Sequence, residues 1–183
     1  KSCRNIHDLR ALARRRLPAP IFHYIDGAAE DETTYRRNTE SFEACDLVPG
    51  VLAGVEEIDL CVEVMGQKLA MPLFCSPTAL QRLFHHDGER AVARAAEKFG
   101  TMFGVSSLTS VPLAEIGAMI RTPKMFQFSF HKDRGLNAQL LERARAAGFD
   151  VLALTVDTII GGKRERDLKT GVKTAPRLTP ATL

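Results

Sequence analysis

Four short apolar runs, each followed by polar residues, dominate the hydrophobic pattern after residue 71. The first covers residues 72–75 and ends in Ser-Pro-Thr-Ala at 76–79. The other three cover residues 102–106, 124–129 and 151–157. An apolar run that becomes polar where the chain leaves the sheet is typical of a buried parallel strand. The pattern therefore predicts four parallel strands.

Amphipathic stretches between these runs predict helices at residues 88–99, 113–120 and 137–147. Gly100 and Gly148 follow the first and third of them, and Pro123 follows the second. Glycine and proline at these places are ordinary signals for the end of a helix. Strands that alternate with helices in this way predict an α/β domain.

The first 71 residues have a different pattern, with helices predicted at 5–16, 21–27 and 31–42. Short strand candidates follow at 46–49 and 55–69, including a hairpin that pairs 61–64 with 68–69. We therefore expect residues 1–71 to form an N-terminal helical cap with short strands, and residues 72–183 to form the repeating part.

Composition and charge narrow the class of protein. The 183 residues are 45% hydrophobic, which is enough for one globular core. The net charge of +3 comes from scattered basic residues, which argues against a nucleic-acid-binding face. Four cysteines without a CxxC pair favour a reduced, cytoplasmic protein, and no apolar run approaches membrane-spanning length. Because the first residue is Lys, we expect a segment of a longer protein.

Two α/β architectures compete for the predicted strands. A doubly wound sheet normally carries G-x-G-x-x-G after its first strand, whereas here the turn is Ser-Pro-Thr-Ala. The sequence Gly-Gly-Lys-Arg at 161–164 is not a P-loop either. In a TIM (β/α)8 barrel, polar residues at the C-terminal ends of the strands build the site. All four runs end this way, so we predict the N-terminal cap and about four βα units of such a barrel. Half a barrel has open edges, and we expect partner strands elsewhere.

The strand ends carry neutral donors and acceptors: Thr78, Ser106, Gln127 and Thr155, with the Ala79 backbone N–H beside them. This set suits a planar heterocycle bound along its polar edge without proton transfer. Arg164, after the fourth strand, suits a carboxylate or phosphate. For any one hydroxyl taken singly, a role in capping a helix or satisfying a loop is favoured over a ligand, whereas for the whole set it is not.

Charged candidates are weaker. Asp157 is either a base or a loop anchor, and residues 30–32 (Glu-Asp-Glu) fit a solvated helix start. His85 and His86 are adjacent, and adjacent side chains rarely point at one target, which favours loop or cap roles. No metal-ligand spacing is present, so no metal site is expected.

Five segments together resemble the FMN-dependent 2-hydroxy-acid dehydrogenase/oxidase family, in the right order over nearly the whole chain. They are residues 24–32, 76–79, 126–127, 154–158 and 162–167. Residues 132–135 and 162–171 look most like the family's bacterial quinone-linked L-lactate dehydrogenases.

The resemblance implies a TIM barrel that holds FMN and oxidises an L-2-hydroxy acid, with L-lactate to pyruvate as the first choice, by hydride transfer to flavin N5. It implies the following flavin-binding residues: Pro77, Thr78, Ala79, Ser106, Gln127 and Thr155. The substrate-binding residues that it implies are Tyr24, Ser129 and Arg164. It also implies a quinone as electron acceptor, a homo-oligomer (a tetramer in relatives), and a cytoplasmic location with peripheral inner-membrane attachment as a second option.

Two departures from the family pattern matter. Ser129 stands where the family has a substrate-contacting Tyr. The family's His base, its flavin-contacting Lys and its phosphate-binding glycines would follow in a C-terminal half, so we expect no catalytic residue in this chain and no activity from it alone. That half is expected to be cleaved from the chain or lost. The competing functions are an FMN barrel with non-redox isomerase chemistry and a catalytically impaired remnant.

Overall fold

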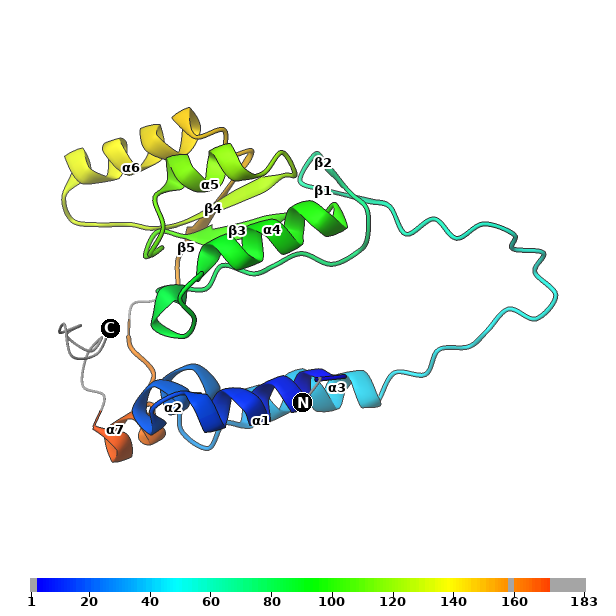
Figure 1. Ribbon diagram of the computed structural model, residues 1–183, viewed down its shortest axis with the longest axis horizontal. Helices are drawn as coiled ribbons and strands as arrows, with labels where there is room; N and C mark the ends of the chain where they lie inside the picture. Colours follow the sequence, from blue (N-terminus) through cyan, green and yellow to red (C-terminus); the bar gives the residue numbers. More distant parts are fainter. Residues whose placement is uncertain (1–2, 158–159, 172–183) are drawn as a thin grey trace. The chain divides into compact units, whose positions relative to one another are not determined.

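The computed structural model describes residues 3–157 and 160–171 (Figure 1). The chain divides into two compact units, one of residues 54–159 and one of residues 1–53 with 160–183. This division differs from the expected boundary at residue 71, because the hairpin before residue 71 packs with the sheet and the last helix packs with the N-terminal helices. Each unit is described separately below.

The first of these units contains a parallel sheet in the order β3-β4-β5, formed by β3 (Phe103–Ser106), β4 (Lys124–Ser129) and β5 (Val151–Thr155). Three of the four predicted strands are thus confirmed, although β3 and β5 are shorter than expected. The first predicted strand contributes a single parallel bridge, between Cys75 and Phe103. Pro72 and Pro77, on either side of Cys75, lack the backbone N–H that a longer ladder would need.

Helices α4 (Glu89–Phe99), α5 (Leu113–Met119) and α6 (Arg134–Ala146) connect the strands, and the short helix η1 (Gln81–Leu83) precedes α4 (Figure 1). Residues two apart on a strand share one face, so Phe126 and Phe128 both pack with Ala144 of α6. A second cluster joins Ala93 of α4 and Ile116 of α5 to β3. These apolar contacts fix one face of the sheet against its helices.

The other face of β4 changes character along the strand. Met125, at its beginning, packs in a cluster with Leu69 of the β1–β2 hairpin, whereas Gln127 and Ser129 further along are polar. The hairpin pairs β1 (Val62–Val64) with β2 (Gln67–Leu69), as predicted. Apolar packing therefore closes the N-terminal end of this face, and polar side chains occupy its C-terminal end.

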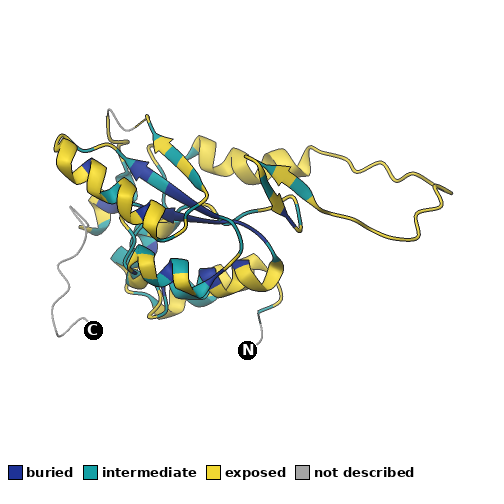
Figure 2. Cartoon of the chain, turned by 90° about the horizontal axis from the view of Figure 1, so that it is seen from above, coloured by how far each residue is buried: buried dark blue, intermediate teal, exposed yellow. Residues whose placement is uncertain are grey.

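The strand prediction at residues 46–49 is wrong. Leu47 and Val48 are 95% and 90% exposed, and Figure 2 colours this segment as exposed throughout. No described residue pairs with this stretch to form a ladder, and a lone extended segment is not a strand.

The second unit contains α1 (Ile6–Arg16), α2 (Ala19–Asp26), α3 (Thr33–Glu43) and α7 (Glu165–Thr170). The Asn5 side chain caps α1 by accepting a hydrogen bond of 2.8 Å from the Asp8 amide. The first three helices agree with the prediction within a few residues. Helix α7 was not predicted, because its six residues are too few to show a hydrophobic period.

Within the described residues, β5 pairs with β4 alone, and Leu152 and Leu154 of β5 are 53% and 56% exposed. The parallel α/β arrangement is confirmed, and the closed barrel stays a prediction. No helix among residues 3–157 and 160–171 is both long enough and apolar enough to cross a membrane.

Candidate functional site

The predicted side chains at the ends of β3, β4 and β5 form one hydrogen-bond network. The Ser106 hydroxyl donates to Gln127 Oε1 at 2.9 Å, and Gln127 Nε2 donates to Ser129 Oγ at 3.1 Å and to Thr155 Oγ1. The sheet register explains these contacts, since Ser106 lies opposite Gln127 and Ser129 lies opposite Thr155. The strands therefore bring together four of the predicted residues.

Gln127 is the hub of this strand-end network. Ser129 and Thr155 both accept hydrogen bonds from its amide, so each hydroxyl keeps its own O–H for a ligand. Ser106 is buried and also accepts a hydrogen bond of 3.1 Å from the Leu108 amide, which fixes its position. The network carries no charge. It is therefore suited to holding polar ring atoms without exchanging protons with them.

The turn at residues 76–80 packs beside the end of β3. Gly104 of β3 lies so close that an added Cβ would be 2.8 Å from Pro77 Cδ and 3.0 Å from the Cys75 carbonyl oxygen. The Leu80 amide donates to the Leu108 carbonyl at 3.0 Å, and Gln81 Nε2 donates to the Thr78 carbonyl at 3.3 Å. These contacts fix a turn that would otherwise be free to move.

Ala79 is half-buried in this turn, and its amide N–H donates to no acceptor within residues 3–157 and 160–171. A fixed, unpaired N–H is a suitable donor to a ligand atom. The Thr78 side chain is exposed and Pro77 is half-buried. Pro77, Thr78 and Ala79 thus lie on one rigid turn beside the strand-end network.

Arg164 and Tyr24 lie together in the helical unit. Arg164 Nε donates to Asp167 at 2.7 Å, and its Nη2 donates to the Gly27 carbonyl at 3.0 Å and to the Tyr24 carbonyl. The guanidinium carbon is 5.3 Å from the centroid of the Tyr24 ring. Only Nη1 has no acceptor among the described residues, so the predicted carboxylate contact of Arg164 depends on that nitrogen.

Sequence reasoning missed an ion network next to these residues, between α2 and α7. Arg10 donates to Asp26 at 2.5 and 2.9 Å, and Arg166 bridges Asp26, at 2.9 Å, and Glu32. The hydrogen bond from Arg10, followed by Arg166, lowers the pKa of Asp26 below its ordinary value. This network ties α7 to α2. The opposite charges of segments 24–32 and 162–167 were the available signal.

The cavity found in the sheet unit, of about 650 Å³, lies elsewhere, between the β3–α5 loop, α5 and α6. Its lining includes Ser107, Phe126 and Arg143 and none of the predicted flavin-binding or substrate-binding residues. It is therefore separate from the strand-end network.

The family model for FMN-dependent dehydrogenases matches residues 13–183. The chain belongs to this family. Glycolate oxidase 1 of Oryza sativa subsp. indica is 39% identical over 175 residues, covering 96% of this chain and 47% of that protein. The L-lactate dehydrogenase of Vibrio parahaemolyticus is 41% identical over 165 residues, covering 90% and 44%.

Solved structures agree with these sequence relatives. A lactate oxidase from Pediococcus acidilactici has a TM-score of 0.88 at 34% identity, covering all of this chain and 50% of its own. Mandelate oxidase with (S)-2-phenylpropionate has a TM-score of 0.88 at 32% identity, covering 100% and 54%. The chain thus spans about half the length of the relatives that it matches.

The family is FMN-dependent, and the residues present fit the polar edge of a flavin. The Thr155 hydroxyl and the Ala79 amide are neutral donors without an acceptor among the described residues, and they match the carbonyl oxygens and nitrogens of an isoalloxazine ring. The individual roles of these residues stay predictions.

Proposed function

We propose that this chain provides the flavin-binding turn and strand ends of an enzyme that oxidises an L-2-hydroxy acid, with L-lactate as the first candidate. The observation that carries the proposal is the network in which Gln127 joins Ser106, Ser129 and Thr155. Bound FMN would accept the substrate hydride at N5. This chain's own residues would hold and orient the reactants.

Each part of the site has a distinct task in this proposal. Ser106, Gln127 and Thr155 would bind the polar edge of the ring, and the Ala79 amide would donate to it. Pro77 and Thr78 would lie against the ring. Neutral donors favour electron density on a flavin without supplying a proton. The rigid turn and the buried Ser106 mean that little reorganisation is required on binding.

Tyr24, Ser129 and Arg164 are proposed to hold the substrate. Arg164 Nη1 would donate to the substrate carboxylate while Nε and Nη2 keep the guanidinium oriented. The base that removes the hydroxyl proton is proposed to come from a C-terminal half, as are the phosphate contacts. A quinone acceptor, a homo-oligomer and a cytoplasmic location, with peripheral membrane attachment as the second option, complete the proposal.

Ser129 favours one alternative, a catalytically impaired remnant. Its hydroxyl already accepts from Gln127 and is too short to replace the phenol that family members have at this position. A lost hydrogen bond in the active site costs about 1–3 kcal/mol, or roughly ten- to a hundredfold in rate. The proposal is therefore slow turnover rather than none.

Anaerobic reduction of the intact flavoprotein tests the proposal. L-lactate should bleach the visible flavin absorbance, whereas D-lactate, as the stereochemical control, should not. Glycolate and mandelate in parallel would rank the substrates. A flavin that stays oxidised with every L-2-hydroxy acid would refute oxidation of this class and favour non-redox chemistry, and protein without flavin would favour the remnant.

A further inference from the structure

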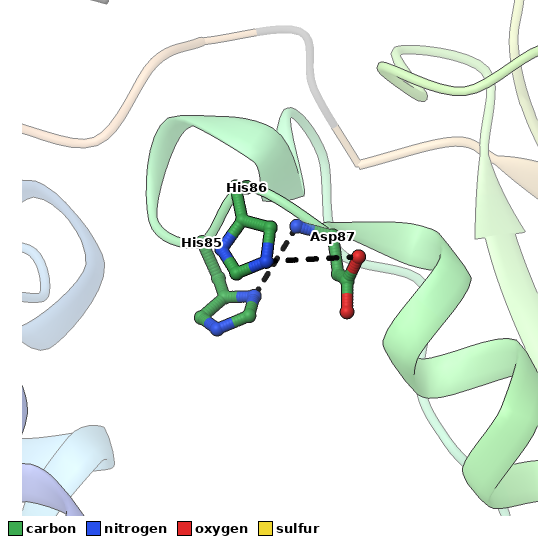
Figure 3. A group of neighbouring side chains, drawn as sticks. All are labelled: His85, His86 and Asp87. Atoms are coloured by element: carbon green, nitrogen blue, oxygen red, sulfur yellow. Dashed lines mark hydrogen bonds and ion pairs between the residues drawn. The ribbon is translucent and has the colours of Figure 1, made fainter.

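The turn between η1 and α4 gathers three side chains of the kinds that bind metal ions. One ligand atom from each of His85, His86 and Asp87 lies within 4.8 Å of the others. Figure 3 shows both imidazoles on the same side of the turn as the Asp87 carboxylate. The sequence favoured loop or cap roles, because adjacent side chains rarely converge. Here they do, with ring centroids 4.3 Å apart and a tilt of 33°.

The spacing between the donors is close to that of ligands on one ion. His86 Nε2 is 3.8 Å from Asp87 Oδ1, which is too long for a hydrogen bond. Two ligands at about 2.0–2.1 Å from a tetrahedral metal lie about 3.3 Å apart. His85 Nδ1 accepts only a long hydrogen bond, 3.2 Å, from the Asp87 amide. A bound ion would take the place of the hydrogen bond to His85 Nδ1. It would also bring His86 Nε2 and Asp87 Oδ1 slightly closer together.

The backbone of the turn is fixed before any ion arrives. The His85 amide donates to the Gln81 carbonyl at 3.1 Å, and the Gly88 amide donates to the His85 carbonyl at 2.9 Å. Arg82 Nε donates to the His86 carbonyl at 3.3 Å. Ligands on a preorganised turn lose little conformational entropy on binding.

Arg94 orients the carboxylate and also limits its charge. Its guanidinium binds Asp87 Oδ2 at 2.5 Å, which leaves Oδ1 facing His86. A partner on the second oxygen is the usual means by which a ligating carboxylate is held in place. Because Arg94 offsets the negative charge, the site offers little to a hard cation that requires several oxygens. Two imidazoles favour nickel, copper or zinc.

We propose that His85, His86 and Asp87 bind one divalent transition-metal ion, at a site separate from the strand-end network. His86 is largely exposed, with 82% of its side chain accessible, so water would complete the coordination. The ion would tie the turn that follows residues 76–80 to the start of α4. Since the proposed oxidation uses none of these three side chains, failure of one proposal leaves the other intact.

Calorimetric titration of the intact, untagged protein with NiCl2 tests the site. Exposed Cys45 and Cys61 should first be replaced by Ser, because thiolates compete for soft ions. We expect one ion per chain, and at least a tenfold loss of affinity in H85N and in H86N. His7→Asn is the matched control, since His7 is an exposed histidine on α1, and it should bind as the parent does.

Thermal unfolding gives a second measurement on the same proteins. NiCl2 should raise the Tm of the parent and of H7N, and should leave the Tm of H86N unchanged, because only a native-state site stabilises the fold. Circular dichroism without metal should be the same for all variants.

In the calorimetric titration, no saturable heat, or undiminished binding in both H85N and H86N, would overturn the proposal. MgCl2 should give no heat, and equal binding of magnesium would contradict the assignment of a transition metal.

Discussion

Ser129 is the residue on which the proposed rate depends. Its Oγ lies 3.1 Å from Gln127 Nε2, opposite Thr155 in the sheet, so a larger side chain would extend from the strand-end network at the end of β4. Ser129→Tyr should raise kcat/KM about ten- to a hundredfold, since a phenol restores one active-site hydrogen bond. Steady-state kinetics of the intact enzyme with L-lactate measure the change. Ser129→Phe supplies the ring without the hydroxyl, and an equal gain with Phe would contradict the argument.

Gln127 should matter to flavin affinity rather than to the fold. Gln127→Leu keeps the volume of the side chain and removes all three amide hydrogen bonds, leaving Ser106, Ser129 and Thr155 without their shared partner. We expect FMN to bind about ten- to a hundredfold more weakly, from a loss of about 1–3 kcal/mol. Fluorescence titration of apoprotein with FMN measures this. Gln139→Leu, on the exposed side of α6, should leave the affinity unchanged.

At the scale of elements, the close approach of β3 to the turn at 76–80 gives a sharp test. Gly104→Ala would place a Cβ 2.8–3.0 Å from Pro77 and from the Cys75 carbonyl, and backbone cannot move aside as a flexible side chain can. We expect a loss of about 1–3 kcal/mol in stability from overpacking, together with weaker FMN binding. Urea unfolding and FMN titration measure the two effects. Gly161→Ala has open space around its Cβ and should be neutral in both.

The packing of α7 on α2 predicts a dependence on pH. Asp26 has its pKa lowered by Arg10 and Arg166, so its contribution is complete above the ordinary carboxylate pKa and is lost as pH falls through the folded value. Asp26→Asn should cost about 1–3 kcal/mol at neutral pH. Hydrogen exchange of the α7 amides should show this. The difference from the parent should shrink below about pH 4, and the exposed control Asp31→Asn should show no difference at either pH.

The sequence predicted the elements whose signal lies in neighbouring residues, and it did not predict contacts between residues far apart in the chain. The apolar runs at 124–129 and 151–157 are local and strong, and β4 begins and ends as expected, while β5 ends two residues early. The placement of Gln127, Ser129 and Thr155 at the strand ends could be predicted because strand ends show directly in the pattern, whereas their roles stay predictions. The contacts of Arg164 with the Tyr24 and Gly27 carbonyls span about 140 positions, and no local period encodes them. The convergence of His85 and His86 depends on backbone turns that a sequence pattern does not specify.

At the scale of the whole molecule, the unpaired edge of β5 determines whether the chain self-associates when it is expressed by itself. Within the described residues β5 has one strand partner, and Leu152 and Leu154 remain more than half exposed. An open apolar edge is a template for association. We therefore expect the 183-residue chain, expressed alone, to self-associate and to bind FMN poorly, because the proposed phosphate contacts lie in a C-terminal half.

Light scattering after size exclusion would measure that association. A double change of Leu152 and Leu154 to Lys should reduce it without altering the far-ultraviolet dichroism, because both side chains point away from the strand-end network. Co-expression with the C-terminal half of a family member should instead give a heterodimer that retains FMN. A folded monomer of 20.2 kDa would show that the sheet edge is satisfied within the chain, and the half-barrel interpretation would then be wrong.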